Sequence, residues 1–446
     1  MSEYLPVRQH AIVMGAGIAG LLAARALSPH FKRVTMVERD ALPLVPASRD
    51  GVPQGKHIHV LLPGGLGALD RLFPGRVAEL LGNGAQPFDY GQSQFYFTGR
   101  WMPRIQTGLN TIAQTRPFLE HHMRRWVGEL PNVEIVHEAN VTALLWDNSG
   151  ERVTGLAVRR AAGGPGQHAG EELRSDLVID ATGRSSLLAR WLTEKAFTLI
   201  PETRVGIDLG YSTACFRVPE RLRPTHPMLY IVGRPPHSTR AGVRVLVEAG
   251  MVFGAMAGYH GDHPPGDLKG FLEFARSLSQ PDVFDVLSQS ELVSPIVRYR
   301  IPSAIRRHYG SMRRFPRGVL PLGDSVCSFD PVFGQGMTVT ALEAECLADA
   351  LGVHCSSDDR LRREYFRRID AVIDVAWDMS SGENFKYPQT TGRRPLLYGL
   401  TRRYKERVAL CADMGVVHDM YRVSSMTAPP EILLRPRTVA RALGFR

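Results

Sequence analysis

The pattern of apolar and polar positions predicts a strand, a helix and a second strand at the beginning of the chain. Residues 11–14 are all apolar, a helical run extends to Leu27, and residues 34–37 form a second, largely apolar run. Short apolar runs of this kind are typical of parallel strands that are buried on both faces. Glycines occupy the junction between the first strand and the helix, so this segment predicts a tight βαβ unit.

Two later segments have the same apolar character and predict further strands of the same sheet. Residues 177–179 form one apolar run that ends in Asp180, and residues 319–324 form another. A helix is predicted over residues 334–351. Because these segments lie far apart in the sequence, we expect the parallel sheet to belong to a discontinuous domain.

Shorter runs, separated by turn residues, predict two more sets of strands. The first set is a β-meander, with strands over residues 133–137, 141–146 and 152–159. The second set is an antiparallel sheet in a second domain, with strands over residues 228–232, 243–249 and 251–259. Helices are predicted over residues 66–81, over residues 115–128 with Thr115 as the N-cap, and over most of the chain after residue 361.

These elements together predict an α/β fold. We expect a Rossmann-like nucleotide-binding domain with a parallel sheet and a β-meander, a substrate domain with a mixed or antiparallel sheet, and a helical C-terminal region. The expected boundaries are residues 1–62, 102–190 and 298–355 for the first domain, 63–101 and 191–297 for the second, and 356–446 for the helical region.

Length and composition fit a protein of several domains. The chain has 446 residues, 44% of them hydrophobic and 22% charged, which is typical of globular proteins. No apolar run approaches the roughly 20 residues that a membrane-spanning helix needs, and no signal-peptide pattern precedes the first strand, so we expect a cytoplasmic protein. The cysteines lack metal-ligand spacing, so we expect reduced thiols and no metal site; they are Cys215, Cys327, Cys346, Cys355 and Cys411.

The net charge of +10 comes mainly from arginine. Arginines cluster at residues 298–317 and 393–407, and we expect most of them on exposed faces of helices and loops. Basic segments interleaved with aromatic residues are not evident, which argues against a nucleic-acid-binding protein. An anionic cofactor or substrate, or a solvated basic surface, explains the charge more simply.

Candidate chemistry begins at the turn after the first strand. Gly15, Gly17 and Gly20 have GxGxxG spacing, and Glu38 ends the second strand. In this motif the first glycine permits a tight turn, the second lets the backbone approach a pyrophosphate, and the third lets helix and strand pack closely. The N–H groups at the helix N-terminus favour phosphate, and Glu38 stands where an acid binds ribose hydroxyls. The βαβ unit therefore predicts a site for an adenine dinucleotide.

Three more segments would join this site if the domain is discontinuous. Residues 176–184 follow a buried strand, and residues 323–337 follow another. Arg116 lies in the first turn of a predicted helix, from where its guanidinium could bind the pyrophosphate.

With these motifs the sequence resembles FAD-dependent monooxygenases of the para-hydroxybenzoate hydroxylase type, the group A flavin enzymes. The motifs that carry the resemblance are the glycine fingerprint with Glu38, the run from Asp176 to Ala181-Thr182-Gly183-Arg184-Ser185-Ser186, and the run from Gly323-Asp324-Ser325 through Asp330-Pro331 to Gly334-Gln335-Gly336-Met337. The segment Gly51-Val52-Pro53-Gln54 with His57 and His59 narrows the resemblance to an actinobacterial branch that includes epoxidases of polyether polyketide biosynthesis.

The resemblance implies FAD as the cofactor. It places Asp324 at the ribityl hydroxyls, Arg49 near the flavin phosphates or ring, and the helix opening near Gly334 at the pyrimidine edge, where reduced flavin gathers negative charge. The full expected set of FAD-binding residues is Gly15, Ala16, Gly17, Ala19, Gly20, Glu38, Arg39, Arg49, Gln54, Arg116, Val141, Ala181, Thr182, Gly183, Asp324, Pro331, Gly334, Gln335, Gly336 and Met337.

The resemblance also implies a reaction. Reduced FAD reacts with O2 to give a C4a-hydroperoxide, which transfers one oxygen atom to an apolar, polyketide-like natural-product intermediate by epoxidation or hydroxylation. NAD(P)H is the expected reductant, although Thr182 replaces the aspartate of the family's Asp-Gly motif and leaves that partner less well supported than FAD. The sequence has no second GxGxxG motif after a strand, and the absence of a Trp-x-Trp pair argues against a tryptophan-halogenase-like enzyme.

Candidate residues for catalysis and substrate binding are fewer. His57 and His59 are possible acid–base groups near the flavin, although two histidines this close on a strand are more often structural. Phe95, Phe97 and Trp101 share one face of a predicted strand, and Met251, Phe253, Ala255 and Ala257 share a face of another. Either set could line a substrate cavity, and core packing explains both equally well.

Two other functions remain open from the sequence. A redox-neutral cyclase of the same fold would keep FAD only as a structural element. A flavoprotein without catalytic activity would bind the cofactor and act as a sensor or binding module. The sequence does not indicate the substrate or the oligomeric state.

Overall fold

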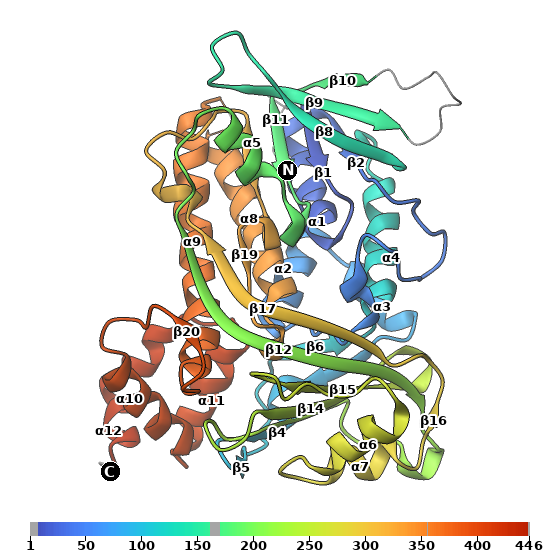
Figure 1. The fold of residues 1–446 in the computed structure, drawn as a ribbon, viewed down its shortest axis with the longest axis vertical. Coiled ribbons are helices and arrows are strands. Elements are labelled where there is room, and N and C mark those ends of the chain that lie inside the picture. The colour runs from blue at the N-terminus through green and yellow to red at the C-terminus, as the bar shows by residue number, and fades with distance from the viewer. Residues whose placement is uncertain (1–7, 161–169, 355, 445–446) are drawn as a thin grey trace.

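Five parallel strands form the central sheet of the computed structural model, which describes residues 8–160, 170–354 and 356–444 (Figure 1). The strand order is β18–β11–β1–β2–β7. Met14 lies opposite both Val37 and Asp180, and Asp180 lies opposite Pro321, so four strands end at one edge. This confirms the predicted sheet built from distant segments. The strands are β1 (Arg8–Met14), β2 (Phe31–Val37), β7 (Val133–Val136), β11 (Leu177–Asp180) and β18 (Val319–Pro321).

The β-meander contains two of the three predicted strands, those over residues 141–146 and 152–159, and a third strand that was not predicted. Its order is β10–β9–β8, with β8 at Ala139–Trp146, β9 at Val153–Arg160 and β10 at Glu171–Arg174. The predicted first strand, residues 133–137, is instead β7, which pairs in parallel with β2 at the edge of the central sheet. It follows helix α4 (Arg116–Gly128), and a strand that returns after a helix joins its sheet in parallel.

A large mixed sheet lies below the central sheet in Figure 1. Its longest strand, β12 (Glu202–Arg217), is missing from the sequence prediction because Gly206, Asp208 and Gly210 interrupt its alternation and a bulge shifts its register. The other strands are β4 (Gln94–Phe97), β5 (Arg100–Trp101), β13 (Met228–Val232), β14 (Arg240–Leu246), β15 (Met251–Gly258), β16 (Glu291–Leu292), β17 (Val297–Arg307), β19 (Cys327–Ser328) and β20 (Thr391–Gly392). A separate pair consists of β3 (Gln86–Asp89) and β6 (Asn110–Ala113).

Two helix predictions can be compared directly with the structure. The Thr115 side chain accepts a hydrogen bond from the Phe118 N–H, which confirms Thr115 as the N-cap of α4. The helix predicted over residues 66–81 is wrong as a single element, because it is split into α2 (Pro63–Leu72) and α3 (Arg76–Gly82). Pro74 cannot continue α2, and Gly75 adopts a left-handed conformation with φ of 78°.

The remaining helices cover the sheets and form the C-terminal region. Helices α1 and α8 pack together, and α8 also packs against α9. Near one end of the molecule α10, α11 and α12 form a separate helical corner (Figure 1). The helices are α1 (Ile18–Leu27), α5 (Leu188–Glu194), α6 (Leu268–Arg276), α7 (Asp282–Leu287), α8 (Gly336–His354), α9 (Asp358–Asn384), α10 (Tyr398–Leu410), α11 (Met414–Ser424) and α12 (Pro436–Ala442).

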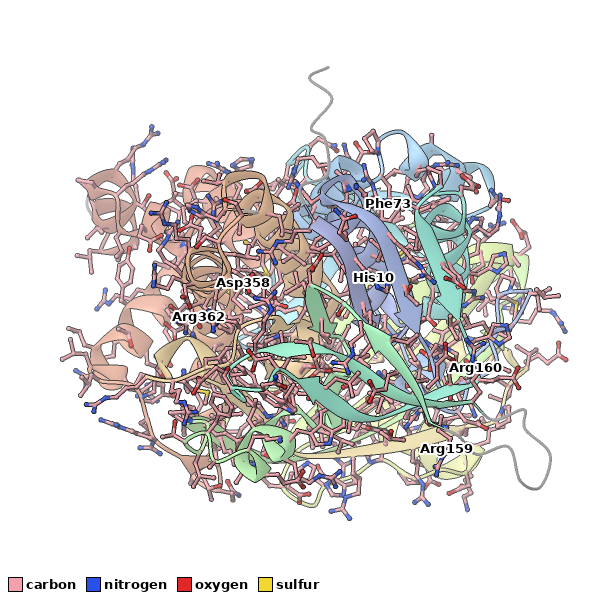
Figure 2. The ribbon with its side chains drawn as sticks, turned by 90° about the horizontal axis from the view of Figure 1, so that it is seen from above. His10, Phe73, Arg159, Arg160, Asp358 and Arg362 are labelled. Carbon is pink, nitrogen blue, oxygen red and sulfur yellow. The ribbon has the colours of Figure 1, made fainter. Side chains whose placement is uncertain are left out.

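Ion pairs attach α9 to both sheets. Asp358, the first residue of α9, is labelled in Figure 2. It accepts a hydrogen bond from Arg8 of β1 at 2.6 Å and also pairs with Arg152. Farther along the helix, Asp370 and Asp374 bind Arg306 of β17. The expectation that arginines 298–317 lie on exposed helices and loops is therefore wrong for Arg306, which is buried on a strand.

The four cysteines among the described residues form no disulfide. Cys215, Cys327, Cys346 and Cys411 are free thiols, whereas Cys355 lies outside the described residues. None of the described helices has the length and apolar character required to cross a bilayer.

We predict that Gly20→Ala destabilises the protein. A Cβ atom at Gly20 would lie 1.9 Å from the Gly15 carbonyl oxygen, so α1 would have to move away from β1. Overpacking of this kind costs about 1–3 kcal/mol, measurable as a lower free energy of unfolding in urea. Gly82→Ala on α3 is the matched control, because its Cβ would meet no atom within 4 Å. Equal stability of the two variants would contradict the prediction.

Candidate functional site

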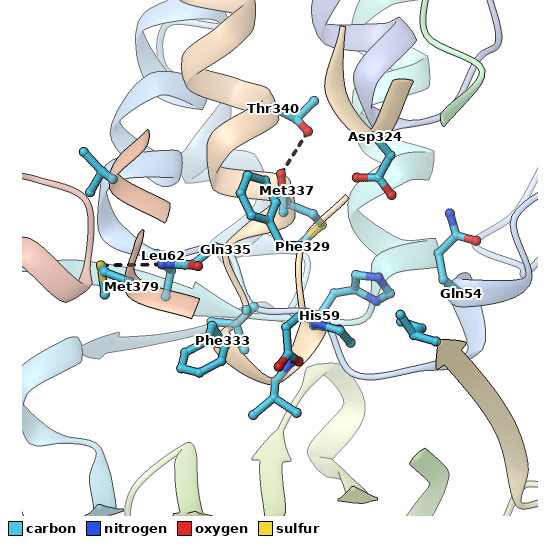
Figure 3. Close-up of a pocket in the computed structure, with 18 of the residues that line it drawn as sticks. Gln54, His59, Leu62, Asp324, Phe329, Phe333, Gln335, Met337, Thr340 and Met379 are labelled. Carbon is cyan, nitrogen blue, oxygen red and sulfur yellow. Dashed lines mark hydrogen bonds between the residues drawn. The ribbon is translucent and has the colours of Figure 1, made fainter. Parts of the chain in front are cut away.

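A cavity of about 1190 Å³ begins at the edge where the parallel strands end. It continues along one face of the large sheet and reaches the C-terminal helices. Its walls at one end are backbone turns and charged side chains, and at the other end they are mainly aromatic and aliphatic side chains. Figure 3 shows the central part, with Asp324 and Gln54 on one side and Gln335 and Met379 on the other.

The glycine turn after β1 is shaped by close backbone contacts. Gly15 has φ of 95°, and a Cβ atom there would lie 2.9 Å from the Ala181 carbonyl oxygen. Gly17 differs, because a Cβ atom there would meet only guanidinium nitrogens of Arg49 and Arg116, at 3.8 and 3.9 Å. The turn therefore presents open backbone to the cavity at Gly17, with two cations beside it.

Arg49 lies at the centre of a buried ion cluster. Its Nη1 lies 2.8 Å from Glu38 Oε2 and 3.1 Å from Asp40 Oδ2, and its Nε donates to Glu120 Oε1 at 2.9 Å. Burial alone would lower the pKa of Arg49, but Glu120 and Glu38 outweigh it and raise the pKa. The Nη2 atom is buried and has no hydrogen-bond partner among the described residues, so one donor of this cation is still available.

Glu38 borders the cavity and also supports the glycine turn. Its Oε2 accepts the Ala16 N–H at 2.8 Å, and its Oε1 accepts the Asp40 N–H at 3.0 Å. Burial opposes ionisation of Glu38, but Arg49 and the two backbone N–H groups lower its pKa. Because Oε2 also faces Arg49 Nη1, the capacity for a further hydrogen bond, such as one from a ribose hydroxyl, lies on Oε1.

Arg116 and His59 face each other across the cavity wall. Arg116 Nη1 lies 3.3 Å from His59 Nε2, and His59 Nδ1 lies 3.0 Å from the His57 carbonyl oxygen. The carbonyl can only accept, so His59 carries its proton on Nδ1 and accepts from Arg116 through Nε2. Burial and the Arg116 charge lower the pKa of His59 to about 3, so it is a neutral acceptor near neutral pH.

His57 lies behind the cavity wall. It is 4% exposed, its Nδ1 lies 2.9 Å from Thr213 Oγ1, and its ring packs edge-on against Tyr211. Burial, with a smaller effect of Lys56, lowers the pKa of His57 to about 4. The structure therefore gives His57 a packing role and does not place it on the cavity surface.

Asp324 extends from the end of β18 into the cavity (Figure 3). Its carboxylate accepts no hydrogen bond from the described residues, and burial raises its pKa despite nearby Arg184 and Arg116. The preceding Gly323 N–H donates to Oε2 of Glu343 at 2.6 Å, while the other oxygen of Glu343 has no partner in the described part of the chain. Burial raises the pKa of Glu343 to about 8, against a lowering by this N–H.

Asp180 is a residue that the sequence prediction missed. It is fully buried at the end of β11 and accepts hydrogen bonds from the Thr182 N–H, the Thr182 hydroxyl and the Ser186 hydroxyl, at 3.0, 2.6 and 2.5 Å. Thr182 thus holds the turn closed at the position where the resemblance led us to expect an aspartate. The acid that ends the apolar run was visible in the sequence and could have been identified.

The loop before α8 is held from two sides. The Tyr230 hydroxyl donates to the Val332 carbonyl oxygen at 2.5 Å, and the Tyr259 hydroxyl donates to Asp330 Oδ2 at 2.8 Å. Burial raises the pKa of Asp330 to about 6. Gln335 turns its side chain toward Met379 of α9, away from Asp324 (Figure 3). The first N–H groups of α8 are left at the cavity surface, beside Gly336.

The apolar end of the cavity differs in part from the prediction. Phe95 and Phe97 line it, together with Tyr96, whereas Trp101 lies outside, 38% exposed and edge-on to Tyr96. Met251 and Phe253 do not line it either. They pack into a neighbouring apolar cluster, and the next residues on the same strand face, Ala255 and Ala257, form the wall.

Other lining residues come from helices and were not predicted. Helix α9 contributes Met379 and Glu383, and α11 contributes Val417, Met420 and Tyr421. No sequence signal could identify them, because an amphipathic helix has the same pattern whether its apolar face meets a core or a cavity.

The structure brings nearly all predicted FAD-binding residues to one cavity. Ala16 and Gly20 do not line it; the Ala16 N–H binds Glu38 and Gly20 packs against Gly15. Those that line it are Gly15, Gly17, Ala19, Glu38, Arg39, Arg49, Gln54, Arg116, Val141, Ala181, Thr182, Gly183, Asp324, Pro331, Gly334, Gln335, Gly336 and Met337. Among the described residues no group of three potential ligands could hold a metal ion.

These residues fit a dinucleotide such as FAD. Gly17 leaves space for a phosphate beside two cations, and the buried Arg49 Nη2 lacks a partner that a phosphate oxygen would supply. The carboxylate of Asp324 is aimed at the cavity without a donor, as a partner for polyol hydroxyls would be.

Comparison of the sequence with those of known proteins identifies a relative but no family model. No model of a known protein family matches the sequence. Over 392 residues the chain is 34% identical to protein Rv3254 of Mycobacterium tuberculosis, covering 86% of this chain and 82% of that protein.

Solved structures show a likeness of fold. The flavin-dependent brominase Bmp2 has a TM-score of 0.67 at 16% identity, covering 93% of both chains. PqsL, a probable FAD-dependent monooxygenase from Pseudomonas aeruginosa, has a TM-score of 0.64 at 17% identity, covering 84% of this chain and 97% of its own. The p-nitrophenol 4-monooxygenase PnpA from Pseudomonas putida DLL-E4 has a TM-score of 0.67 at 15% identity, covering 94% and 97%. The chain therefore has the α/β fold of FAD-binding monooxygenases and halogenases.

We predict that Glu343→Gln changes how stability depends on pH. The carboxyl has a pKa of about 8 when folded and an ordinary value of 4.5 when exposed, so folding becomes less favourable as the pH rises between these values. Glutamine does not titrate, so the variant should gain stability over the wild type by up to about 1.4 kcal/mol per pH unit in this range and level off above it. Urea unfolding from about pH 5 to pH 9 measures the difference.

Glu194→Gln is the control for this experiment, because Glu194 is a well-exposed residue of α5. Its stability curve should run parallel to that of the wild type. A parallel curve for Glu343→Gln as well would show that the buried carboxyl has an ordinary pKa.

Proposed function

The chain belongs to the protein family of Rv3254 and has the fold of FAD-dependent monooxygenases, and from this premise we propose that it is itself an FAD-dependent monooxygenase. The proposed reaction inserts one oxygen atom from O2, by epoxidation or hydroxylation, into an apolar, polyketide-like intermediate. NAD(P)H is the proposed reductant. The proposal includes the narrower resemblance to polyether-type polyketide epoxidases.

One observation carries this proposal, namely the continuity of the cavity. A single space joins the fingerprint turn and Asp324 to a wall that includes Phe95, Phe97 and Tyr421. A site that only bound a cofactor would not need an apolar region beyond the cofactor-binding end. An extension beyond the flavin end is what a second, apolar ligand would occupy.

The residues divide the work of binding FAD in this proposal. Arg49 and Arg116 would bind the pyrophosphate beside Gly17, Glu38 the adenosine ribose, and Asp324 the ribityl chain. The N-terminus of α8 would stabilise negative charge on the reduced ring through backbone N–H groups. Bound and reduced, FAD supplies the electrons that activate O2.

The remaining walls position substrate and exclude water. The hydroxyl of Tyr230 fixes the Val332 carbonyl, which holds the loop before α8 against the large sheet. His59, neutral and bound to Arg116, would keep that guanidinium turned toward the cofactor without adding charge. The aromatic end would keep the reacting atoms dry, which protects a reactive oxygen species from hydrolysis.

The domain division is part of the same proposal. Residues 1–62, 102–190 and 298–355 would bind FAD, residues 63–101 and 191–297 would form most of the substrate chamber, and the helical C-terminal region would close it. The redox-neutral cyclase stays a second candidate on one observation, the replacement of the motif aspartate by Thr182.

We predict that Gly17→Ala weakens FAD binding without unfolding the protein. The added methyl meets protein atoms only at ordinary contact distances of 3.8 and 3.9 Å, but it would stand where a phosphate should approach the backbone. We expect about tenfold weaker binding, since crowding a close-fitting site costs about 1–3 kcal/mol. Fluorescence titration of the apoprotein with FAD measures the affinity, with Gly82→Ala as the control. Unchanged affinity would place the pyrophosphate elsewhere.

We predict that the product carries one atom from molecular oxygen. The FAD-loaded protein, supplied with NADPH and a panel of apolar polyenes and polyketides, should oxidise NADPH faster with an accepted substrate than without one. Mass spectrometry of a reaction under labelled dioxygen should then show a single labelled oxygen atom. Complete turnover without oxygen or reductant would select the cyclase. FAD binding with no ligand-dependent change in reduction rate would select the non-catalytic flavoprotein.

A further inference from the structure

Exposed leucines and arginines surround the place where the cavity reaches the surface of the C-terminal region. Pro395, Leu396, Tyr398 and Arg402 line the cavity, and Leu396 is also 88% exposed. A residue that both lines the cavity and faces solvent marks an opening. We refer to residues 393–403, which include the first turn of α10, as the docking loop.

The apolar part of the docking loop protrudes. Leu396, Leu397 and Leu400 are 88%, 72% and 67% exposed, so their side chains are accessible to a partner. Leu397 also has φ of 61°, a left-handed conformation that is unfavourable for a leucine. In the described structure these leucines remain exposed, and Leu397 keeps its left-handed conformation.

The docking loop and the part of α10 that follows it are strongly basic. Residues 393–407 contain Arg393, Arg394, Arg402, Arg403, Lys405 and Arg407, against the single acid Glu406. Within the described part of the chain, no ion pair is formed by Arg393, Arg403 or Arg407. Figure 1 places α10 at the outer corner of the molecule, where a flat surface can reach it.

We propose that the docking loop binds anionic lipid membranes at their surface. Protruding leucines beside arginines suit a bilayer interface, because the leucines enter the acyl boundary while the cations meet lipid phosphates. This docking goes beyond the proposed function and does not depend on it. It would bring the opening of an apolar cavity to the phase in which apolar compounds dissolve.

Vesicle sedimentation with the full-length protein tests this docking. Sucrose-filled vesicles of phosphatidylcholine with roughly one third phosphatidylglycerol should carry the protein into the pellet, and pure phosphatidylcholine vesicles should not. High salt should release it, because salt screens charges at a surface. Failure to bind the anionic vesicles at low salt would overturn the proposal.

Variants then identify the surface. The triple variant Leu396→Ser, Leu397→Asn and Leu400→Ser should lose vesicle binding, and asparagine tolerates the left-handed conformation at position 397. Each of Arg393→Gln and Arg403→Gln should weaken binding roughly fivefold. The control Leu199→Ser replaces another leucine, 78% exposed, and Arg313→Gln another exposed arginine; both should bind like the wild type.

Two outcomes would assign the loop to something else. Vesicle binding that survives the triple variant would place the membrane contact on another surface. Light scattering that shows a dimer lost in the triple variant, without vesicle binding by the wild type, would make a second copy of the chain the occupant. Because sedimentation requires no turnover, failure here leaves the monooxygenase proposal intact, and an inactive protein that binds vesicles would leave this proposal intact.

Discussion

The site depends on the close packing of three backbone turns at the edge where the parallel strands end. Gly15 lies against Ala181, with only 2.9 Å between the Ala181 oxygen and the place of a Cβ atom. The Gly183 N–H donates to the Ser325 hydroxyl at 3.0 Å, which joins the turn after β11 to the turn after β18. Because a Cβ atom has no room at Gly15, the turn after β1 is made of backbone alone at this point. The carboxylates of Glu38, Asp180 and Glu343 accept hydrogen bonds from backbone N–H groups of these turns.

Much of this arrangement was predictable because each strand of the central sheet is a continuous apolar run followed by a short polar signature. The turn at Gly15, the acids Glu38 and Asp324, and the helix after Gly334 all follow from such runs. The large sheet was only partly predictable, since β12 carries glycines and an aspartate inside the strand and bends at a bulge. The assignment of residues 133–137 failed for another reason, because local sequence does not say which sheet a short strand joins.

Predicting side chains at the site was harder than predicting its backbone. Motif spacing predicted Glu38 at the dinucleotide site and the family resemblance predicted Arg49 there, but neither could show that the two residues bind each other within a cluster that includes Glu120. Period-two alternation put Met251, Phe253, Ala255 and Ala257 on one face, but of these only Ala255 and Ala257 reach the cavity. Which part of a strand face meets a cavity depends on what packs over its other end, here the cluster of Val60, Phe88 and Phe95.

The effect of the net positive charge depends on where the arginines lie in the structure. The arginines of this chain lie in three different environments. Arg49 and Arg306 are buried among carboxylates, where they fix turns and helices, and they offer little attraction to a distant anion. Arg116 is half-buried beside the open backbone of Gly17, with a neutral histidine as its neighbour. Arg393 and Arg403 are exposed at the far end of the cavity. A positive balance of +10 therefore says little by itself, and the surface that can attract an anionic partner is the one whose cations have no carboxylate to neutralise them.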